Sequence, residues 1–206
     1  MPPSSTPARD WRAYGRPDLD VVLTAAVDAF NELGYHAATV RDIARRCGLS
    51  VAGIYHHHAG KQEMLMAVLT SVMEELKWRN AAAREAGGND PVHRFCNQVR
   101  TLTLSHIYWQ KPTAIGSTEM RSLEEPNRAR FIAMRAELQE HIQRDVDLAV
   151  EQGAFHTAHP IMAVGAVAGM CLQTAQWYSA DGELSPEQIA QNTVDVALDI
   201  VAHRPI

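Results

Sequence analysis

The chain has 206 residues, of which 46% are hydrophobic and 6% aromatic, and its formal net charge is −5. This length and apolar content allow a buried core in one large or two small domains, and the scarcity of aromatic residues favours helix over sheet. The negative charge argues against a generally basic nucleic-acid-binding surface. No apolar run reaches the roughly 18 residues that a membrane span needs.

The charge is uneven along the chain. Residues 1–61 carry seven Lys and Arg against six Asp and Glu, whereas residues 62–206 carry twelve against eighteen. A DNA-facing N-terminal part on an acidic body fits this distribution.

The cysteines Cys47, Cys96 and Cys171 are scattered and odd in number. We therefore expect neither a disulfide framework nor a metal site built on them. The first residues lack the apolar stretch of a signal peptide, and a cytoplasmic location is expected.

Residues 1–17 are rich in Pro, Ser and Arg and predict a flexible arm. Its Arg9, Arg12 and Arg16 either reach DNA phosphates and the minor groove or belong to a solvated tail. Residues 18–33 then predict a first helix, with Phe30 at the centre of a small core and Gly34 ending the helix.

Residues 39–61, TVRDIARRCGLSVAGIYHHHAGK, predict two short helices joined by a tight turn. Thr39 is suited to cap the first helix, and Gly48 is suited to end it in a left-handed conformation. Ser50 is suited to cap the second helix. Two helices around a Gly-containing turn form a helix-turn-helix, which places its second helix in the DNA major groove.

Leu49 and Ile54 are expected to anchor this second helix, which leaves small and polar residues on its outside. Small side chains let the backbone approach base edges, while hydroxyl and basic groups reach phosphates. Lys61 begins the next helix, where a phosphate would be favoured by the helix N-terminus. The candidate DNA contacts are Thr39, Arg41, Ser50, Val51, Ala52, Gly53, Tyr55, His56, His57 and Lys61.

At these residues the chain resembles the TetR family of bacterial transcriptional repressors. The family pattern is T-hydrophobic-R-D-I-A, then G-hydrophobic-S, then L-Y-x-H-F-x-S-K. This chain departs from it at His58, where the family has Phe, and at Gly60, where the family has Ser. Gly still serves as a helix cap, and His58 is expected to weaken the local core. The resemblance implies a repressor that binds a double-stranded DNA operator and responds to a small-molecule effector.

The rest of the chain predicts a linking helix over 61–86 and five bundle helices. Four of the bundle helices are expected over residues 91–108, 127–152, 160–178 and 185–203. The fifth is a short helix that follows Pro112 and runs through Met120 and Leu123. The expected fold is all-α with about nine helices. The expected domains are the arm (1–17), a three-helix DNA-binding domain (18–62), and a ligand-binding and dimerisation domain (63–206).

The segment GMCLQTAQWYSADGELSPEQIA, with EQGAF before it, is similar to one branch of TetR C-terminal domains. That branch includes repressors of fatty-acid and steroid-side-chain catabolism whose ligands are acyl-CoA thioesters. The resemblance implies an effector of this class.

A ligand cavity is usually apolar with a few aimed polar groups. Apolar residues of the bundle would hold an acyl chain, and arginines would pair with a CoA pyrophosphate. The alternative is that these residues are plain core and solvated arginines. The candidate ligand contacts are His106, Trp109, Met120, Arg121, Phe131, Arg135, Gln173 and Trp177.

The last two helices are expected to pair with their copies in a homodimer. The helix over 160–178 has a face of small residues, Gly165, Ala168 and Gly169. The helix over 185–203 has an apolar stripe, Val194, Ala197, Leu198 and Val201. Both features indicate a helix interface. Ligand in the bundle is expected to tilt the linking helix and move the two DNA-reading helices apart.

Other functions are disfavoured. Side chains of the consecutive His56, His57 and His58 point about 100° apart on a helix, so they do not converge on one metal. Neither a nucleophile turn nor a phosphate-binding loop is present, so we expect no enzyme, cofactor or metal. The alternative is a small-molecule-binding or enzymatic bundle with a vestigial helix-turn-helix. Such a chain would lose the basic and hydroxyl groups between Ser50 and Lys61, which this one retains.

Overall fold

The computed structural model describes residues 9–204, and within that range it contains nine α-helices and one 3-10 turn, η1. The prediction of an all-α fold is confirmed. The elements are α1 (Val21–Leu33), α2 (Val40–Cys47), α3 (Val51–His57), α4 (Lys61–Ala86), α5 (Pro91–Tyr108), α6 (Gln110–Thr118), η1 (Met120–Ser122), α7 (Asn127–Glu151), α8 (Pro160–Trp177) and α9 (Pro186–Ile200).

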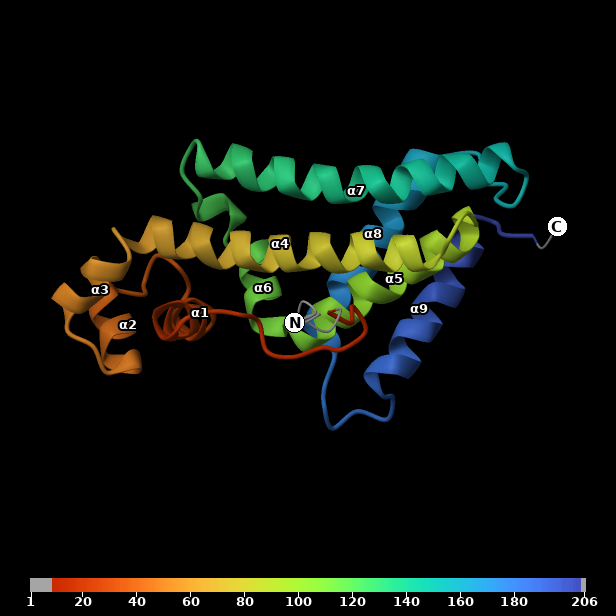
Figure 1. Ribbon diagram of the computed structural model, residues 1–206. Coiled ribbons are helices and arrows are strands. Elements are labelled where there is room, and N and C mark those ends of the chain that lie inside the picture. The colour runs from red at the N-terminus through yellow and green to blue at the C-terminus, as the bar shows by residue number, and fades with distance from the viewer. Residues whose placement is uncertain (1–8, 205–206) are drawn as a thin grey trace, which may run out of the picture.

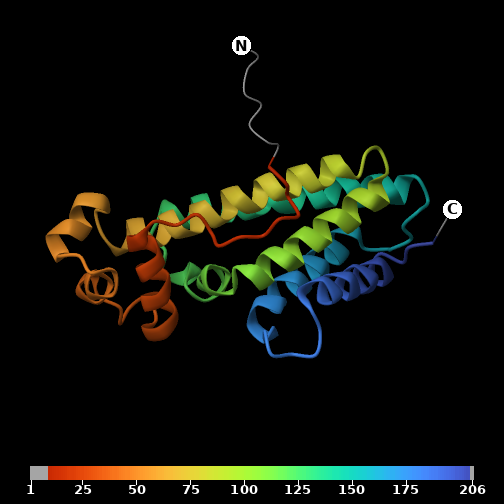
Figure 2. The same ribbon diagram turned by 60° about the horizontal axis from the view of Figure 1, so that its bottom comes forward.

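The helices α1 to α3 lie together at one end of the molecule, and α4 extends from them along its length (Figure 1). The other long helix, α7, runs beside α4. Turning the molecule shows α5 crossing beneath this pair, with α8 and α9 on its other side (Figure 2). Residues 101–107 of α5 are all buried, so α5 is the central helix of the bundle.

The first helix begins three residues later than its sequence predicts. The Asp20 carboxylate accepts a hydrogen bond from the Leu23 amide at 2.7 Å and caps α1 at Val21. An acidic side chain at this position satisfies an otherwise unpaired amide, so the helix starts where the cap lies. Phe30 is buried, as predicted.

The break after α5 also differs from its prediction. The chain leaves helical geometry at Trp109, and Pro112 lies inside the first turn of α6, where a missing amide hydrogen costs nothing. Met120 was predicted to lie in this short helix, but it belongs to the separate turn η1.

Residues 9–17 are packed against the bundle, which corrects this part of the predicted flexible arm. Trp11 is buried, and the Arg79 guanidinium of α4 donates to the carbonyls of Trp11 (2.6 Å) and Ala13 (2.9 Å). The Trp109 indole N–H donates to the Gly15 carbonyl at 2.9 Å. These bonds satisfy backbone groups that would otherwise need water. Residues 1–8 of the predicted arm lie outside the described residues.

Two of the three arginines that were candidates for DNA contact, Arg9 and Arg12, have partners within the chain, whereas Arg16 is exposed. Arg9 pairs with Glu75 of α4 and lies over the Trp78 ring. The Arg12 guanidinium lies over the ring of Trp11.

A buried carboxylate joins three helices at the end of the bundle remote from α1 to α3. The Asp145 side chain of α7 is only 1% exposed. It accepts two hydrogen bonds from Arg84 of α4, at 2.7 and 2.8 Å, and one from Gln98 of α5 at 2.8 Å. Arg94 of α5 adds a longer ion pair at 3.6 Å. A buried charge held by two cations and an amide is well compensated.

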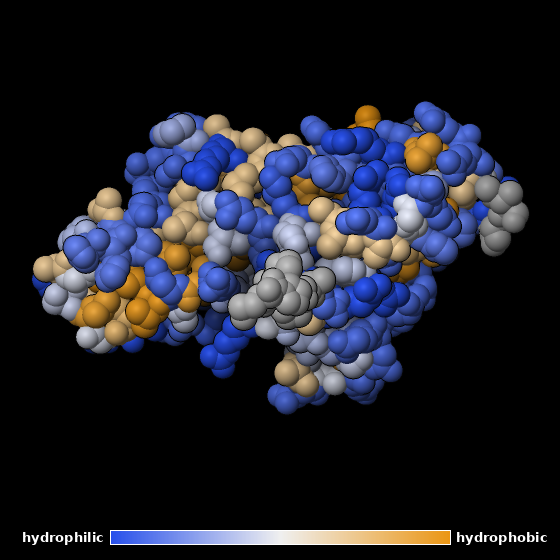
Figure 3. Space-filling model, in the orientation of Figure 1, coloured by the Kyte–Doolittle hydropathy of each residue, from blue (hydrophilic) through white to orange (hydrophobic). Residues whose placement is uncertain are grey.

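In the space-filling view, hydrophilic residues cover most of the face shown, and hydrophobic colour gathers over the small N-terminal domain (Figure 3).

Among residues 9–204, no helix is both long enough and apolar enough to cross a membrane.

Candidate functional site

The helix-turn-helix forms because its caps are all present. Thr39 and Asp42 exchange the two bonds of a capping box: the Thr39 hydroxyl accepts from the Asp42 amide at 3.1 Å, and the Asp42 carboxylate accepts from the Thr39 amide at 3.1 Å. Gly48 ends α2 with φ of 71°, a left-handed conformation that favours glycine. The Ser50 hydroxyl then caps α3 by accepting from the Gly53 amide at 3.0 Å.

The second helix of the helix-turn-helix, α3, is anchored by one side and open on the other. Ile54 is fully buried, whereas Leu49, which was predicted to share this anchoring role, is 37% exposed. Most of the predicted DNA contacts lie on the open side. The exposed ones are Thr39, Arg41, Ser50, Val51, Ala52, Tyr55, His56 and His57.

Gly53 is half-buried, and a Cβ built on it would meet only ordinary contacts, at 3.4 Å from the Ser50 hydroxyl and 3.7 Å from the Leu49 Cβ. The fold of this chain therefore does not demand glycine there.

Lys61 has a structural role instead of the predicted phosphate contact. Its ammonium donates to the backbone carbonyls of Tyr35 and Ala38, both at 2.7 Å, and to that of His36 at 3.4 Å. These three carbonyls belong to the loop between α1 and α2. Burial lowers the pKa of the Lys61 amine. Because an ammonium has three donors, this arrangement leaves none for DNA.

Replacing Lys61 with Met is therefore expected to lower the free energy of unfolding by about 2 kcal/mol, since it removes charge-assisted hydrogen bonds to carbonyls. Chemical denaturation followed by circular dichroism measures this loss. The matched control is Arg41→Ala, at an exposed position of α2, which should leave the free energy of unfolding unchanged within about 0.5 kcal/mol. It should also reduce the salt dependence of DNA binding by about one phosphate contact. Equal stability of both variants would contradict the structural role of Lys61.

His58 is buried between two carboxylates. Its Nδ1 lies 3.1 Å from the Glu63 carboxylate of α4, and its Nε2 lies 3.3 Å from the Asp20 carboxylate that caps α1. The departure from the family pattern at His58 thus replaces an apolar contact with polar contacts that join the start of α1, the end of α3 and the start of α4.

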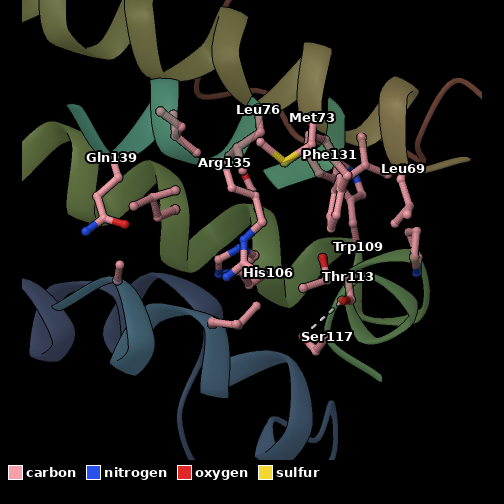
Figure 4. Close-up of a pocket in the computed structure, with 18 of the residues that line it drawn as sticks. Leu69, Met73, Leu76, His106, Trp109, Thr113, Ser117, Phe131, Arg135 and Gln139 are labelled. Carbon is pink, nitrogen blue, oxygen red and sulfur yellow. Dashed lines mark hydrogen bonds between the residues drawn. The ribbon is translucent and has the colours of Figure 1, made fainter. Parts of the chain in front are cut away.

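A second candidate site is a cavity of about 240 Å³ inside the bundle. Its walls come from α4, α5, α6, α7 and α8, and Figure 4 shows their side chains converging on it. Most of the wall is apolar. The apolar lining includes Leu69, Val72, Met73, Leu76, Leu102, Trp109, Pro112, Phe131, Leu138, Ile142 and Leu172.

Four predicted ligand contacts line this cavity: His106, Trp109, Phe131 and Arg135. The other four do not. Met120 lies just outside it, with its sulfur 3.8 Å from the Arg135 guanidinium. Arg121, Gln173 and Trp177 lie on the exposed surface, and Trp177 is 55% exposed. The reason is helix phase, because Gln173 and Trp177 lie on the face of α8 that points away from α5.

Sequence reasoning missed the α4 wall of the cavity. Leu69, Val72, Met73 and Leu76 recur at the helical spacing of an apolar stripe, which is also the spacing of packed core. Their helical spacing is the same in both cases, so periodicity could not distinguish a cavity wall from a filled core.

The polar groups of the cavity are few and specific. They are Ser105, His106, Thr113, Ser117, Arg135 and Gln139. His106 is 9% exposed, and burial lowers its pKa to about 4, so the imidazole is neutral at physiological pH. Its Nδ1 and the Thr113 hydroxyl oxygen have no hydrogen-bond partner among the described residues.

The outer face of α8 carries two of the three predicted small residues, Gly165 and Gly169, whereas Ala168 is half-buried and lines the cavity. Gly165, Ala166 and Gly169 are exposed, and a Cβ on either glycine would meet nothing within 4 Å. The stripe predicted on α9 is wrong, however, because Val194, Ala197 and Val201 are buried in this chain's own core. The exposed apolar residue on α9 is Val196.

Two family models match this chain. One, described as bacterial regulatory proteins of the tetR family, covers residues 22–68, which include the helix-turn-helix. The other, described as a Tetracyclin repressor-like C-terminal domain, covers residues 88–201, which is more than half of the chain.

The HTH-type transcriptional repressor KstR2 of Mycobacterium tuberculosis is 27% identical over 182 residues, which cover 86% of this chain and 89% of that protein. Its Rhodococcus jostii counterpart is 23% identical over 186 residues, covering 88% and 89% of the two chains.

The crystal structure of AibR in complex with isovaleryl coenzyme A and operator DNA is similar at a TM-score of 0.78 and 26% identity, over 85% of this chain and 95% of that one. The structure of KstR2 of Mycobacterium tuberculosis, at a TM-score of 0.83 and 20% identity over 92% and 99% of the chains, shows the same fold. With a capped helix-turn-helix joined to a helical bundle, and with both halves matched by family models, this chain belongs to the TetR family of DNA-binding transcriptional repressors and is not an enzyme.

Proposed function

We propose that this repressor binds a pseudo-palindromic operator as a homodimer and is released from it by an acyl-CoA thioester. One observation carries the ligand response: the bundle cavity is walled by α4 and α6, and both helices also contact the DNA-binding domain. A molecule that fills the cavity therefore acts on the elements that orient α3.

The contacts between α6 and the DNA-binding domain are polar and direct. Lys111 of α6 pairs with Asp28 of α1 at 2.5 Å, and the Asn31 amide of α1 donates to the Lys111 carbonyl at 3.1 Å. The Gln62 amide of α4 donates to the Ser122 carbonyl at 2.6 Å. A shift of α6 or η1 would be passed to α1 and the start of α4 through these bonds.

The chemistry of the cavity supports an acyl group as the part that enters it. Its wall is mainly apolar, and about 240 Å³ is small for a whole drug-sized ligand. Arg135 adds a guanidinium beside Phe131, suited to a phosphate or a thioester oxygen. The likeness to AibR, whose structure holds isovaleryl coenzyme A and operator DNA, supports this class of effector.

The homodimer is supported by the open face of α8. Gly165, Ala166 and Gly169 are exposed together with Ile161 and Met162, each of which is 72% exposed. Small residues let two helices approach closely, and exposed large apolar residues beside them favour burial by a partner. Gly165 and Gly169 also line the cavity, so ligand and partner chain would meet the same helix.

The release mechanism follows from the spacing of the operator. A dimer places its two recognition helices in successive major grooves about 34 Å apart. A ligand between α4, α6 and α7 would favour a conformation with a different separation, by as much as its affinities for the two conformations differ. Couplings of this kind are commonly about 1–3 kcal/mol, and operator DNA must weaken ligand binding by the same factor.

Acyl-CoA thioesters of graded chain length are expected to release a fluorescent operator, selected from random oligonucleotides, whereas free CoA should not. Fluorescence anisotropy at constant ionic strength measures release. A coupling of about 1–3 kcal/mol weakens operator binding roughly 5- to 150-fold. Failure to select any salt-sensitive sequence would contradict operator binding. If only an unrelated apolar compound released the DNA, the proposal of a ligand-responsive repressor would stand, and the assignment of an acyl-CoA effector would be wrong.

A further inference from the structure

The connector between α6 and α7 joins two walls of the cavity and also touches the DNA-binding domain. Gly116 and Ser117 of α6 line the cavity just before it, and Phe131 and Arg135 of α7 line the cavity after it. Residues 119–124 of this connector, which include η1, lie beside the start of α4 (Figure 1). A ligand that changes the spacing of α6 and α7 therefore has to move the connector.

Gln62, in the first turn of α4, binds the connector and the DNA-binding domain together with both polar atoms of its side chain. Its amide nitrogen donates to the Tyr35 hydroxyl at 2.9 Å and to the Ser122 carbonyl at 2.6 Å. Its amide oxygen accepts from the Glu124 amide at 3.2 Å. A side-chain amide has two N–H donors, so both are used. Gln62 thus bridges the connector and the loop between α1 and α2, which leads into the helix-turn-helix.

Both ends of this bridge are held by further contacts of buried residues. Tyr35 is buried, its ring packs 5.3 Å from that of Phe30, and its carbonyl accepts from Lys61. Ser122 is also buried, and its hydroxyl donates to the Glu119 carboxylate at 2.8 Å. Packed side chains have little room to adjust separately. A displacement of the connector is therefore passed to Tyr35 through Gln62.

The polar contacts between α6 and α1 are more exposed than this bridge. In the ion pair of Lys111 and Asp28, the two side chains are 65% and 36% exposed. Exposed pairs are weak, because water competes for them and their side chains readjust easily. The Asn31 amide nitrogen donates to the Lys111 carbonyl, but it also donates to the Val27 carbonyl of its own helix. These contacts are less suited than Gln62 to transmit a displacement.

We infer that Gln62 is the residue through which filling of the cavity changes the orientation of the helix-turn-helix. This inference rests on the proposed function in taking the cavity as the effector site, and it narrows the route of the response from several contacts to one side chain. Gln62 does not line the cavity. It is a positioning residue, which acts on DNA binding through Tyr35 and the loop between α1 and α2.

The test replaces the unidentified ligand with a substitution that fills the cavity. Ser105 of α5 is buried, lines the cavity, and has no hydrogen-bond partner for its hydroxyl among the described residues. Ser105→Leu therefore adds apolar volume to the cavity without breaking a hydrogen bond. Fluorescence anisotropy gives the affinity for the selected operator with and without Ser105→Leu. The ratio of the two affinities cancels any effect that a second substitution has on operator binding by itself.

This ratio is compared between the wild type and three backgrounds. Gln62→Met keeps the length of the side chain and removes the bridge. Lys111→Met removes the exposed ion pair, which is the competing route. The matched control is Gln143→Met, the same chemical change at a half-buried position of α7, where the Gln143 amide donates to Asp147 at 2.8 Å.

Ser105→Leu is expected to weaken operator binding at least about fivefold in the wild type, the lower end of common couplings. With Gln62→Met the weakening should fall below about twofold, whereas with Lys111→Met or Gln143→Met it should keep its wild-type size. Equal weakening in all backgrounds would overturn the inference, as would a loss of the effect with Lys111→Met alone. An unchanged affinity for Ser105→Leu in the wild type would also overturn it, because filling the cavity would then not reach the helix-turn-helix.

A second variant breaks the bridge from its other end. Tyr35→Phe removes only the hydroxyl that accepts from Gln62 and keeps the ring that packs on Phe30. It should reduce the effect of Ser105→Leu as Gln62→Met does, and the two together should cause no further reduction, since both break one interaction. Thermal melting followed by circular dichroism checks that each variant is folded. A folded Tyr35→Phe protein with the wild-type ratio would show that the bridge does not carry the response.

The two proposals fail separately. If acyl-CoA releases the operator while Gln62→Met leaves the effect of Ser105→Leu intact, only the role of Gln62 is wrong. If acyl-CoA does not release the operator while Gln62→Met abolishes that effect, the effector class is wrong and the coupling through Gln62 stands.

Discussion

Replacing Ala166 with Arg is expected to give monomers that bind the operator at least about 100-fold more weakly than the wild type. Ala166 is exposed on the proposed dimer face of α8 and does not line the cavity. A buried arginine without a partner at a close helix contact would be costly. A monomer reads one half-site, so it loses the gain from linked binding, which reaches 10²–10⁴-fold.

Sedimentation velocity gives the assembly state and fluorescence anisotropy gives the affinity. The matched control is Ala136→Arg, which adds the same charge to an exposed position of α7 and should leave both quantities unchanged. Gly169, although it lies on the same face of α8, is a poorer choice because it also lines the cavity. A wild type that is monomeric at micromolar concentration, or a monomeric variant with full operator affinity, would contradict the proposed dimer.

Replacing Asp145 with Ala is expected to lower the free energy of unfolding by about 3 kcal/mol, which is at the lower end of the loss that follows removal of one partner from a buried ion pair. The loss has two parts. Arg84 and Arg94 lose the carboxylate with which both of them pair, and the buried Gln98 amide loses its hydrogen-bond acceptor. The cost stays below the upper end of the range because the Arg84 side chain is 34% exposed and can turn toward water.

Urea denaturation of the two variants tests this. The control on the same helix is Glu137→Ala, which removes a carboxylate that pairs with Lys77 at 2.6 Å on the surface. Exposed pairs contribute about 0–1 kcal/mol, so this variant should remain close to the wild type. A loss below about 1 kcal/mol for Asp145→Ala would mean that water reaches the cluster and that the cluster does not hold the three helices together.

The sequence by itself determined the local structure. Caps and breakers act between neighbouring residues, and for this reason Thr39 and Gly48 predict the bounds of α2 correctly and Ser50 predicts the start of α3. The same holds for α4 and α5, whose ends at Lys61, Ala86, Pro91 and Tyr108 match the prediction. Helical spacing also identifies the buried sides of the long helices, because a helix must bury its apolar stripe.

Only the tertiary structure decided what each inward or outward side chain meets. Lys61 has the same spacing whether its ammonium meets a phosphate or the carbonyls of Tyr35 and Ala38. His106 and Trp177 are both polar-tipped residues on bundle helices, yet one lines the cavity and the other is exposed. Such contacts depend on how helices distant in sequence are rotated against one another. That rotation minimises the energy of the whole core, and no local pattern of residues contains it.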